Sequence, residues 1–567
     1  MCGIFCEITC YSNSKTLIKD EEILKRIKNR GPNCVQSKEI KLNESMTVLF
    51  CGAVLWMQGP TLTPQPVEND QGILLYNGDI FDETWDSNVS DTQLIMEKLY
   101  NRTDISSEEY IIKQLRLLKG PFCIIYYDKL NNNLYFTRDR IGRSSLVIHK
   151  NDNSTVISNV LGRNYECVEI PASHIYVLCL GTNTIKLHSW NEKLESQHEI
   201  TIEIWLETLR IQQNLPDEEF KFDYNEEDFN DEEEVVAYMK SVAESTNCKF
   251  TVMNKLMKHA TIRETVVKVT ELLEKSVKIR LKRQPNRCKE CINDGTAHCN
   301  HCSVGILFSG GLDCTILALL ANKYLPEDQS IDLINVAFRK DDNGTYEVPD
   351  RLTGRQSLAE LQRLCPSRKW IFREVNVPKE ELEQNQITII GDLVYPRQTV
   401  LDESLGSVLW FAARGQDQDD MSTCRVLLIG SGADELFGGY IRHRNAFKRS
   451  GWMGLSKELQ LDWQRISFRN LARDNRVICD HGRQPRMPFL DEDFTNVVLQ
   501  LKPWLRCFPC ESLGVGIGDK LMLRLVASNL GLTDAVVLPK RAMQFGSRIA
   551  NKKERGSDVS KTFWNSK

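Results

Sequence analysis

Residues 46–180 contain short runs of aliphatic, β-branched and aromatic residues that follow one another with little helical periodicity. Runs of this kind, separated by polar turn residues, are typical of strands in stacked antiparallel sheets. Two intervals with helical spacing interrupt the series, at residues 21–30 and 91–100, and Ser90 is a suitable cap for the second. The pattern predicts an α+β domain over residues 1–185.

Beyond about residue 255 the pattern changes, because helical segments now alternate with buried β-runs. The β-runs lie at residues 304–308, 331–338, 370–375 and 426–429. Alternation of this kind indicates a doubly wound parallel sheet, whose ligands bind beyond the carboxyl ends of its strands. An α/β domain is therefore expected over residues 256–567.

The interval 186–255 lacks a regular pattern and is expected to be a linker or an insertion. Within it, residues 217–234 carry eleven carboxylates and a single basic residue, Lys221. A charge run of that kind is most simply a solvated segment, because it buries too little apolar surface to fold by itself. We assign it no chemistry.

The length of 567 residues also favours at least two domains, because single cores rarely grow beyond about 300 residues. A net charge of −5 gives no electrostatic reason to expect a nucleic acid or an acidic membrane as partner. No stretch approaches the roughly 20 apolar residues of a membrane-spanning helix. The 19 cysteines are spread thinly along a chain without a signal peptide, so we expect reduced thiols and a cytoplasmic protein.

The chain opens with Met1-Cys2-Gly3-Ile4. Removal of Met1, which is expected before a small residue, would leave Cys2 with both a thiol and a free α-amine. The amine is then a general base for the thiol of the same residue, so that no separate histidine is needed. Cys2 is therefore a candidate nucleophile, although a cysteine at this position is more often without function.

Four further segments follow Cys2 in the order and approximate spacing of class II glutamine amidotransferases, which this region resembles. They are Arg30-Gly31-Pro32-Asn33, Tyr76-Asn77-Gly78-Asp79-Ile80-Phe81, Ser90-Asp91-Thr92 and Arg138-Asp139-Arg140-Ile141-Gly142. The resemblance implies an N-terminal nucleophile αββα sandwich that hydrolyses glutamine. It implies an oxyanion hole formed by the Asn77 side chain and the Gly78 backbone N–H. Asp79 and Asp91 would hold the α-amine of glutamine.

One position departs from that pattern. Where the family usually has an arginine for the α-carboxylate of glutamine, this chain reads Gly52-Ala53-Val54-Leu55. A buried carboxylate without a cation is costly, and a bidentate arginine is hard to replace. We therefore expect glutamine binding to be weak or absent.

A glycine-rich turn follows the β-run at residues 304–308 and leads into an apolar helix. It reads Ser309-Gly310-Gly311-Leu312-Asp313-Cys314-Thr315. Converging backbone N–H groups and a helix N-terminus favour an anion such as phosphate. The turn resembles the PP-loop of ATP pyrophosphatases and is not a Walker A sequence. The resemblance implies ATP binding by Ser309, Gly310, Gly311, Asp313 and Cys314.

A second glycine-rich segment follows the β-run at residues 426–429 and reads Gly430-Ser431-Gly432-Ala433-Asp434-Glu435-Leu436-Phe437-Gly438-Gly439-Tyr440. It resembles a block of asparagine synthetases, and residues 473–476, 486–491 and 518–524 match other blocks of that family. The resemblance covers both domains and leaves mainly residues 190–300 outside it. It implies Gly432 and Asp434 as further ATP-site residues, with Asp313 and Asp434 holding Mg²⁺.

Four positions depart from the full synthetases, in which glutamates stand at Ser431 and Gln484, a lysine at Ala542 and a serine at Cys314. The family lysine is expected to stabilise the adenylation transition state, and the first glutamate to help deprotonate ammonia. Loss of such groups typically lowers rates by several factors of ten. Lys540 and Arg541 lie close in sequence and are alternative cations.

Two Cys-x2-Cys pairs and two histidines precede the first strand of the α/β domain: Cys288, Cys291, Cys299, Cys302, His298 and His301. Four thiolates in two pairs suit a closed tetrahedral zinc site. The seven residues between the pairs are fewer than in common zinc ribbons. Unligated thiols and redox chemistry therefore stay open as alternatives to structural zinc.

The resemblance implies a glutamine-dependent asparagine synthetase. Cys2 would release ammonia from glutamine, ATP with Mg²⁺ would activate the β-carboxylate of aspartate as an acyl-adenylate, and ammonia would displace AMP to give asparagine. The replaced positions favour weakened catalysis. A non-catalytic ATP-binding scaffold or regulator and an amide ligase for another carboxylate are the alternatives. A homodimer is compatible with the sequence but is not determined by it.

Overall fold

The computed structural model describes residues 2–10, 16–100, 106–194, 199–212, 234–246, 248–294, 299–339, 344–418, 420–513, 516–550 and 554–563. Of the acidic segment 217–234, only Glu234 falls within these ranges, so the expectation for that segment lies outside the described residues.

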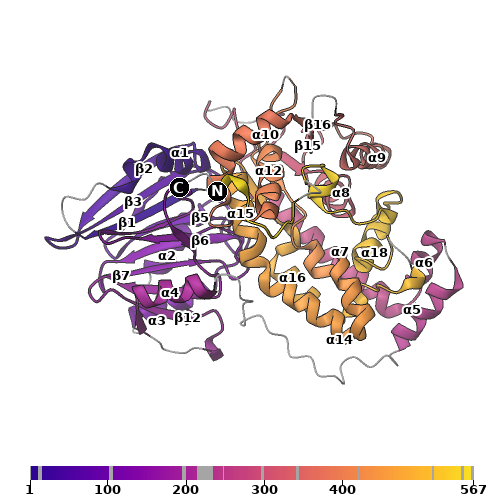
Figure 1. Ribbon diagram of the computed structural model, residues 1–567, viewed down its shortest axis with the longest axis horizontal. Coiled ribbons are helices and arrows are strands. Elements are labelled where there is room, and N and C mark those ends of the chain that lie inside the picture. Colours follow the sequence, from indigo (N-terminus) through magenta and orange to yellow (C-terminus); the bar gives the residue numbers. More distant parts are fainter. Residues whose placement is uncertain are drawn as a thin grey trace.

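Two antiparallel sheets stack face to face in the N-terminal domain (Figure 1). The first sheet contains, in spatial order, β10 (Cys167–Glu169), β8 (Val147–Lys150), β9 (Ser154–Ser158), β1 (Gly3–Cys10), β3 (Met46–Val54) and β2 (Cys34–Lys41). The second contains β13 (Glu199–Thr201), β12 (Thr184–Ser189), β11 (His174–Cys179), β7 (Asn133–Arg138), β6 (Phe122–Asp128), β5 (Gly72–Gly78) and β4 (Val67–Glu68).

Both faces of these sheets are apolar, which is why helices cover the outer ones. Successive side chains of a strand point to opposite faces. On β5, Ile73 and Leu75 therefore enter the core between the sheets, whereas Leu74 and Tyr76 pack toward α2 (Asp91–Tyr100) and α3 (Ser107–Arg116). Helix α1 (Glu21–Arg30) covers the first sheet. The four layers confirm the predicted αββα sandwich.

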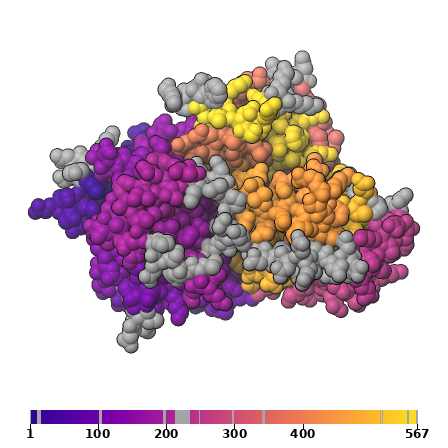
Figure 2. Space-filling view, turned by 60° about the horizontal axis from the view of Figure 1, so that its bottom comes forward, coloured from indigo at the N-terminus to yellow at the C-terminus, as the bar shows by residue number. Residues whose placement is uncertain are grey.

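The expected domain limit at residue 185 falls inside a strand. Strand β12 continues to Ser189, β13 extends the same sheet, and Trp205 of α4 (Ile202–Gln212) packs against Tyr176 with ring centroids 5.0 Å apart. Further along, α5 (Glu234–Ser245) and α6 (Lys249–Leu256) pack with the C-terminal domain, at the end of the molecule opposite the sandwich (Figures 1 and 2). Apolar side chains within the interval thus join it to both domains.

The C-terminal domain contains a five-stranded parallel sheet. Its spatial order is β16 (Trp370–Val377), β15 (Ile331–Phe338), β14 (Val304–Leu307), β17 (Val426–Leu428) and β18 (Gln484–Arg486). The chain starts at the centre, adds two strands on one side and then reverses to add two on the other. Ligands of such sheets bind where the order reverses, which is here between β14 and β17. The predicted doubly wound sheet is confirmed.

Helices surround this sheet. The longer ones are α7 (Ala260–Lys282), α8 (Leu312–Tyr324), α9 (Pro349–Leu364), α12 (Val400–Arg414), α14 (Ile441–Ile466), α15 (Ala472–Cys479), α16 (Glu492–Gln500) and α18 (Leu521–Asn529). Shorter ones are α10 (Lys379–Asn385), α11 (Gly391–Val394), α13 (Ala433–Phe437), α17 (Pro503–Arg506) and α19 (Met543–Gly546). Within the described ranges, no helix combines the length and the apolar character that crossing a membrane requires.

The two domains share a continuous apolar core. Ile23 and Ile27 of α1 belong to the same cluster of buried residues as Val394 of α11 and Trp410 of α12. In the space-filling view the sandwich and the C-terminal domain lie directly against each other (Figure 2). The spatial relation between the two candidate sites is therefore set by packing rather than by a flexible connection.

Candidate active sites

A cavity of about 390 Å³ lies at the carboxyl ends of β14 and β17. The glycine-rich turn after β14 and the segment after β17 form part of its wall, together with residues 538–544. Six of the predicted ATP-site residues line it: Ser309, Gly311, Asp313, Cys314, Gly432 and Asp434. The fold thus brings two segments that are far apart in the sequence to one site, at the switch point of the sheet.

Two glycines in these turns have backbone conformations that other residues rarely adopt. Gly310 has φ +74°, and a Cβ there would lie 2.4 Å from the carbonyl carbon of Thr353. Gly432 has φ +94°, and a Cβ would lie 2.3 Å from the side chain of Leu490. Glycine therefore keeps both turns tight. Gly311 begins helix α8 at the cavity wall, which places a helix N-terminus there.

Two aspartates and two lysines meet at this cavity. Lys520 Nζ lies 2.6 Å from Asp313 Oδ2 and 2.7 Å from Asp434 Oδ1, and Lys540 Nζ lies 2.5 Å from Asp434 Oδ2. Burial by itself raises the pKa of Asp434, but Lys520 and Lys540 outweigh burial and hold that pKa well below its ordinary value. Asp434 is therefore charged at neutral pH.

Lys520 is a site residue to which the sequence assigned no role. It is buried and has φ +54°, a left-handed conformation that is uncommon outside glycine. Strain of this kind persists where the surroundings determine it, and it is often found at ligand sites. The available signal was its place in the segment 518–524, which matches a family block.

The donor set at the cavity fits Mg²⁺. Asp313 Oδ1 is buried and has no hydrogen-bond partner in the part of the chain that the structure describes. A buried carboxylate oxygen normally has a partner, so this one has an unmet demand for a cation or a donor. Mg²⁺ prefers one or two carboxylates together with substrate phosphates. Asp313 and Asp434 would hold it.

The positions that depart from the synthetase pattern differ in where they lie. Ser431, Ala542 and Cys314 line the cavity, whereas Gln484 stands at the start of β18 and does not. Cys314 Sγ donates to a backbone carbonyl of the turn at 3.2 Å, and burial raises the pKa of its thiol to about 11. Lys540 brings a cation to the same cavity that Ala542 lines.

A second cavity, of only about 20 Å³, lies beside Cys2. Its volume is about that of one water molecule and far below that of glutamine. Gln65 occupies the adjoining space, because its Nε2 donates to Cys2 Sγ at 3.8 Å and its Oε1 accepts from the Tyr76 backbone N–H at 2.7 Å. Burial raises the pKa of the Cys2 thiol. The described residues around this cavity include Val54 but no arginine or lysine.

The two predicted oxyanion-hole residues differ in their relation to the Cys2 cavity. Gly78 lines the Cys2 cavity, and a Cβ there would lie 2.4 Å from the carbonyl oxygen of Pro121, so glycine is required. Asn77 Nδ2 instead donates to Cys123 Sγ at 3.4 Å. The structure therefore places Gly78 at the cavity and the Asn77 amide against strand β6.

The two aspartates predicted to hold the glutamine amine also differ. Asp79 Oδ2 accepts from Arg486 Nε at 3.0 Å, and its Oδ1 accepts from Gln58 Nε2 at 3.0 Å. Asp91 lines the cavity, and its Oδ2 has no hydrogen-bond partner among the described residues. Burial and the nearby charge of Asp79 raise the pKa of Asp91 to about 7. Among the described residues that line the cavity, Asp91 is thus the one carboxylate, whereas Asp79 is turned to Arg486.

Arg486 reaches Asp79 across the domain interface, and both side chains are fully buried. Two other buried arginines cross the same interface. Arg143 of the sandwich pairs with Glu492 of α16, and Arg476 of α15 lies 3.2 Å from Glu169 of β10. Sequence reasoning did not identify these pairs, because their partners are hundreds of residues apart.

Three of the four predicted zinc-binding cysteines come together. Cys288, Cys291 and Cys299 form a cluster with His301, whereas Cys302 Sγ donates to the Val304 carbonyl at 3.1 Å and lies outside the cluster. The cluster therefore contains three of the four predicted cysteines together with one of the two histidines beside them. His298 is outside the described residues.

Comparison with known proteins agrees with this two-domain architecture. The family model of the glutamine amidotransferase domain matches residues 55–161, and that of asparagine synthase matches residues 300–456 and 447–559. An asparagine synthetase domain-containing protein of Drosophila melanogaster is 39% identical over 99% of this chain and 100% of its own length. The chain belongs to the asparagine synthetase domain-containing family. The recognition made from the sequence is confirmed.

Two further relatives show the range of the family. Asparagine synthetase domain-containing protein 1 of Homo sapiens is 34% identical over 98% of this chain and 97% of that protein. A nodule asparagine synthetase of Pisum sativum, named as glutamine-hydrolysing, is 22% identical over 89% of this chain and 70% of that protein. The chain is thus similar both to domain-containing relatives and to a named synthetase.

Replacing Arg486 with methionine leaves Asp79 charged and unpaired inside the domain interface. We expect Arg486→Met to lower the free energy of unfolding by about 3–5 kcal/mol, because the remaining charge stays desolvated. Urea unfolding of the full chain measures the change. Arg486→Met/Asp79→Leu should recover most of the loss, since no unpaired charge remains.

The matched control is Lys119→Met, which removes an exposed ion pair of 3.0 Å with Asp493 across the same interface. Its expected effect is at most about 1 kcal/mol. An equal loss of unfolding free energy in Arg486→Met and in Arg486→Met/Asp79→Leu would contradict the role of the buried pair.

The raised pKa of Asp91 predicts a pH dependence of stability. Because its pKa rises from 3.8 to about 7 on folding, its stabilising contribution is complete below about pH 4 and is lost as the pH rises to about 7. Asp91→Asn should therefore be more stable than the wild type at about pH 8, by up to a few kcal/mol, and similar to it at about pH 4. Melting temperature against pH tests this; parallel curves for the two proteins would contradict it.

Proposed function

We propose that the protein is an ATP-dependent amide ligase of the asparagine synthetase type, which activates a carboxylate as an acyl-adenylate and transfers ammonia to it. The observation that carries the proposal is the 390 Å³ cavity, where the PP-loop-like turn, two aspartates and two lysines meet. Aspartate, as the family name implies, is the proposed acceptor.

In the first step, an oxygen of the substrate carboxylate forms a bond to the α-phosphorus of ATP, and the bond to pyrophosphate breaks. The N-terminus of α8 and the turn from Ser309 to Gly311 would receive phosphate oxygens. Lys520 and Lys540 would stabilise the negative charge that develops on the leaving pyrophosphate. In the resting protein the aspartates neutralise these lysines, so that the site does not hold bare positive charge.

Mg²⁺, when bound, would neutralise phosphate charge and orient the triphosphate. Asp313 and Asp434 would hold it. Lys520 and Lys540, which pair with the same carboxylates, lie beside that position and would contact phosphate oxygens.

In the second step, ammonia forms a bond to the acyl carbon, AMP leaves, and a proton is lost from nitrogen. Ser431 offers no carboxylate base for that proton, although it lines the cavity. Glu435 is buried and accepts hydrogen bonds from Tyr440 at 2.7 Å and Asn470 at 3.3 Å, and burial raises its pKa. We therefore propose that the second step is slow.

Ammonia would come from glutamine only inefficiently. After removal of Met1, Cys2 would attack the glutamine amide, but the cavity of about 20 Å³ must first enlarge, and no cation of the described residues lines it for the α-carboxylate. Asp79 is engaged with Arg486. The proposal is thus of an ammonia-using ligase whose glutaminase domain is weak.

A non-catalytic ATP-binding scaffold is the second candidate. Two observations favour it, namely the small volume of the Cys2 cavity and the serine at position 431. An amide ligase for a different carboxylate is the third candidate. These candidates differ in whether pyrophosphate is released and with which acid.

ATP binding at the turn is tested first, by calorimetry with and without Mg²⁺. Asp313→Asn should weaken binding of Mg²⁺–ATP about tenfold or more, because a charge-assisted contact is lost. The same variant should bind metal-free ATP as well as the wild type or better, since it removes a negative charge next to the triphosphate. Weaker binding of Mg²⁺–ATP together with unchanged or stronger binding of metal-free ATP would identify the Asp313 carboxylate as a metal ligand.

The control is Asp328→Asn, which changes an exposed aspartate away from the cavity and should bind both forms as the wild type does. If Asp313→Asn changed the affinity for ATP equally with and without Mg²⁺, or changed it in neither case, Asp313 would not be a metal ligand of the ATP site.

Turnover is tested by pyrophosphate release with ammonia, ATP and a series of carboxylic acids. We expect slow release with aspartate and still slower release when glutamine replaces ammonia. Lys540→Met should lower the rate by about 10²–10³, with ATP affinity nearly unchanged, because the cation acts on charge that develops in the transition state. Lys540→Arg should retain more activity than Lys540→Met.

Ser431→Glu supplies the missing base and should raise ammonia-supported product formation, whereas Ser431→Gln matches its size without the charge and should not. Release with another acid but not with aspartate would support the third candidate. ATP binding without pyrophosphate release in any variant would contradict the ligase proposal and support the scaffold.

A further inference from the structure

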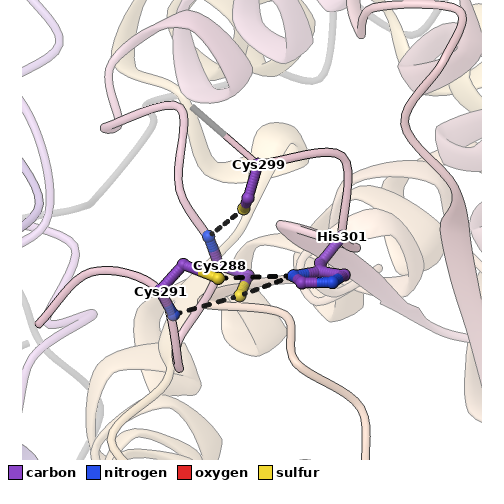
Figure 3. Close-up of side chains that lie close together, drawn as sticks. All are labelled: Cys288, Cys291, Cys299 and His301. Carbon is purple, nitrogen blue, oxygen red and sulfur yellow. Dashed lines mark hydrogen bonds between the residues drawn. The ribbon is translucent and has the colours of Figure 1, made fainter. Parts of the chain in front are cut away.

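A cysteine and histidine cluster lies outside both candidate active sites. Cys288, Cys291, Cys299 and His301 converge in the loop between α7 and β14 (Figure 3). Their ligand atoms all lie within 4.8 Å of one another. The loop leads into the amino end of β14, whereas the ATP cavity lies at its carboxyl end. The cluster is thus separate from the proposed adenylation chemistry.

We propose that these four residues bind one structural zinc ion. Zinc–sulfur bonds of about 2.3 Å and zinc–nitrogen bonds of about 2.0 Å at tetrahedral angles place sulfur and nitrogen about 3.6 Å apart. His301 Nδ1 lies 3.6 Å from Cys288 Sγ and 3.4 Å from Cys291 Sγ. Three sulfur ligands and one imidazole in this geometry favour zinc.

Backbone N–H groups of the loop contact two of the sulfur atoms. The Cys288 N–H donates to Cys299 Sγ at 3.1 Å, and the Cys291 N–H donates to Cys288 Sγ at 3.4 Å. Donors of this kind fix the orientation of a metal ligand. They follow from the local turn, so the loop is shaped for a metal by its backbone as well as by its side chains.

His301, and not Cys302, completes the set. Cys302 is buried, and its Sγ donates to the Val304 carbonyl. Cys302 therefore belongs to the core beneath β14. With four protein ligands the site is closed, as structural zinc sites are, and it has no open position for catalysis.

A buried arginine provides independent support. Arg425 Nη2 donates to the Trp56 carbonyl, but its Nε and Nη1 are buried without a hydrogen-bond partner in the described part of the chain. Burial and the like charge of Arg486 lower the pKa of Arg425 to about 9, and negative charge at Cys288 and Cys299 acts in the opposite direction. Zn²⁺ with three thiolate ligands carries a net charge of −1. That charge would stabilise a buried guanidinium that no carboxylate of the described residues pairs with.

The loop also touches both domains, which indicates what the zinc would stabilise. The Lys289 N–H donates to the Thr423 carbonyl at 2.9 Å, beside the parallel sheet. Asn293 Oδ1 accepts from Asn33 of the sandwich at 2.8 Å, and Arg287 lies over the ring of Trp56 at 5.6 Å. Trp56 lines the Cys2 cavity. Zinc would therefore hold the domain junction next to that cavity.

The test is the metal content of the full chain, purified with a reductant and without chelator, by inductively coupled plasma mass spectrometry. We expect about one zinc per chain in the wild type and less than about a fifth of that in Cys291→Ser and His301→Ala. His301→Cys should retain zinc, because it restores a fourth soft ligand. Cys302→Ser is the matched control and should retain zinc as well.

Cobalt substitution keeps the proposal falsifiable if a variant fails to fold. The wild type loaded with Co²⁺ should show the visible ligand-field bands of a tetrahedral site together with thiolate-to-cobalt charge transfer. Wild-type protein without metal, a spectrum of octahedral cobalt, or a disulfide among these cysteines by mass spectrometry would overturn the proposal. So would zinc that is lost in Cys302→Ser but retained in His301→Ala.

Discussion

The buried ion pairs between the two domains are the constraint on which the rest of the structure depends. Arg486 with Asp79, Arg143 with Glu492, and Arg476 with Glu169 all pair across the interface and away from water. Separating the domains would leave such charges unpaired unless water reached them, and a desolvated single charge is far more costly than the pair. The domains are therefore held in one relative position, with α1 contributing apolar contacts to the same interface.

The two candidate sites differ in how their carboxylates are paired. At the parallel sheet, the aspartates pair with lysines beside the cavity of about 390 Å³. In the sandwich, one of the aspartates is committed to the domain interface, and Gln65 occupies the space beside Cys2. The cavity at the parallel sheet is therefore large, whereas the one beside Cys2 is small. The cysteine and histidine loop contacts this small cavity through Trp56.

Two of the three replaced positions at this cavity differ in their consequences. Ala542 removes a side-chain cation, yet Lys540 brings one to the cavity from two residues earlier in the chain. Ser431 removes a carboxylate, and the neighbouring Glu435 is held by Tyr440 and Asn470. Binding and activation of ATP are therefore better supported than the later transfer of nitrogen.

Much of this protein was determined by its sequence. The short β-rich runs predicted the α+β class of the first domain, and the alternation of helices with apolar β-runs predicted the α/β class of the second, because both patterns are local. The glycine-rich turns were predicted for a local reason too, since Gly310 and Gly432 need a positive φ.

Only the tertiary structure determined which charges meet. It placed Lys520 between Asp313 and Asp434, paired Arg486 with Asp79, and brought His301 rather than Cys302 to the other three cysteines. Each of these depends on the relative positions of residues from different elements, often hundreds of residues apart, and spacing along a chain carries no information about them. Local patterns therefore predicted the elements and turns of this protein, whereas electrostatic pairing, which acts through space, was decided by the packing of its domains.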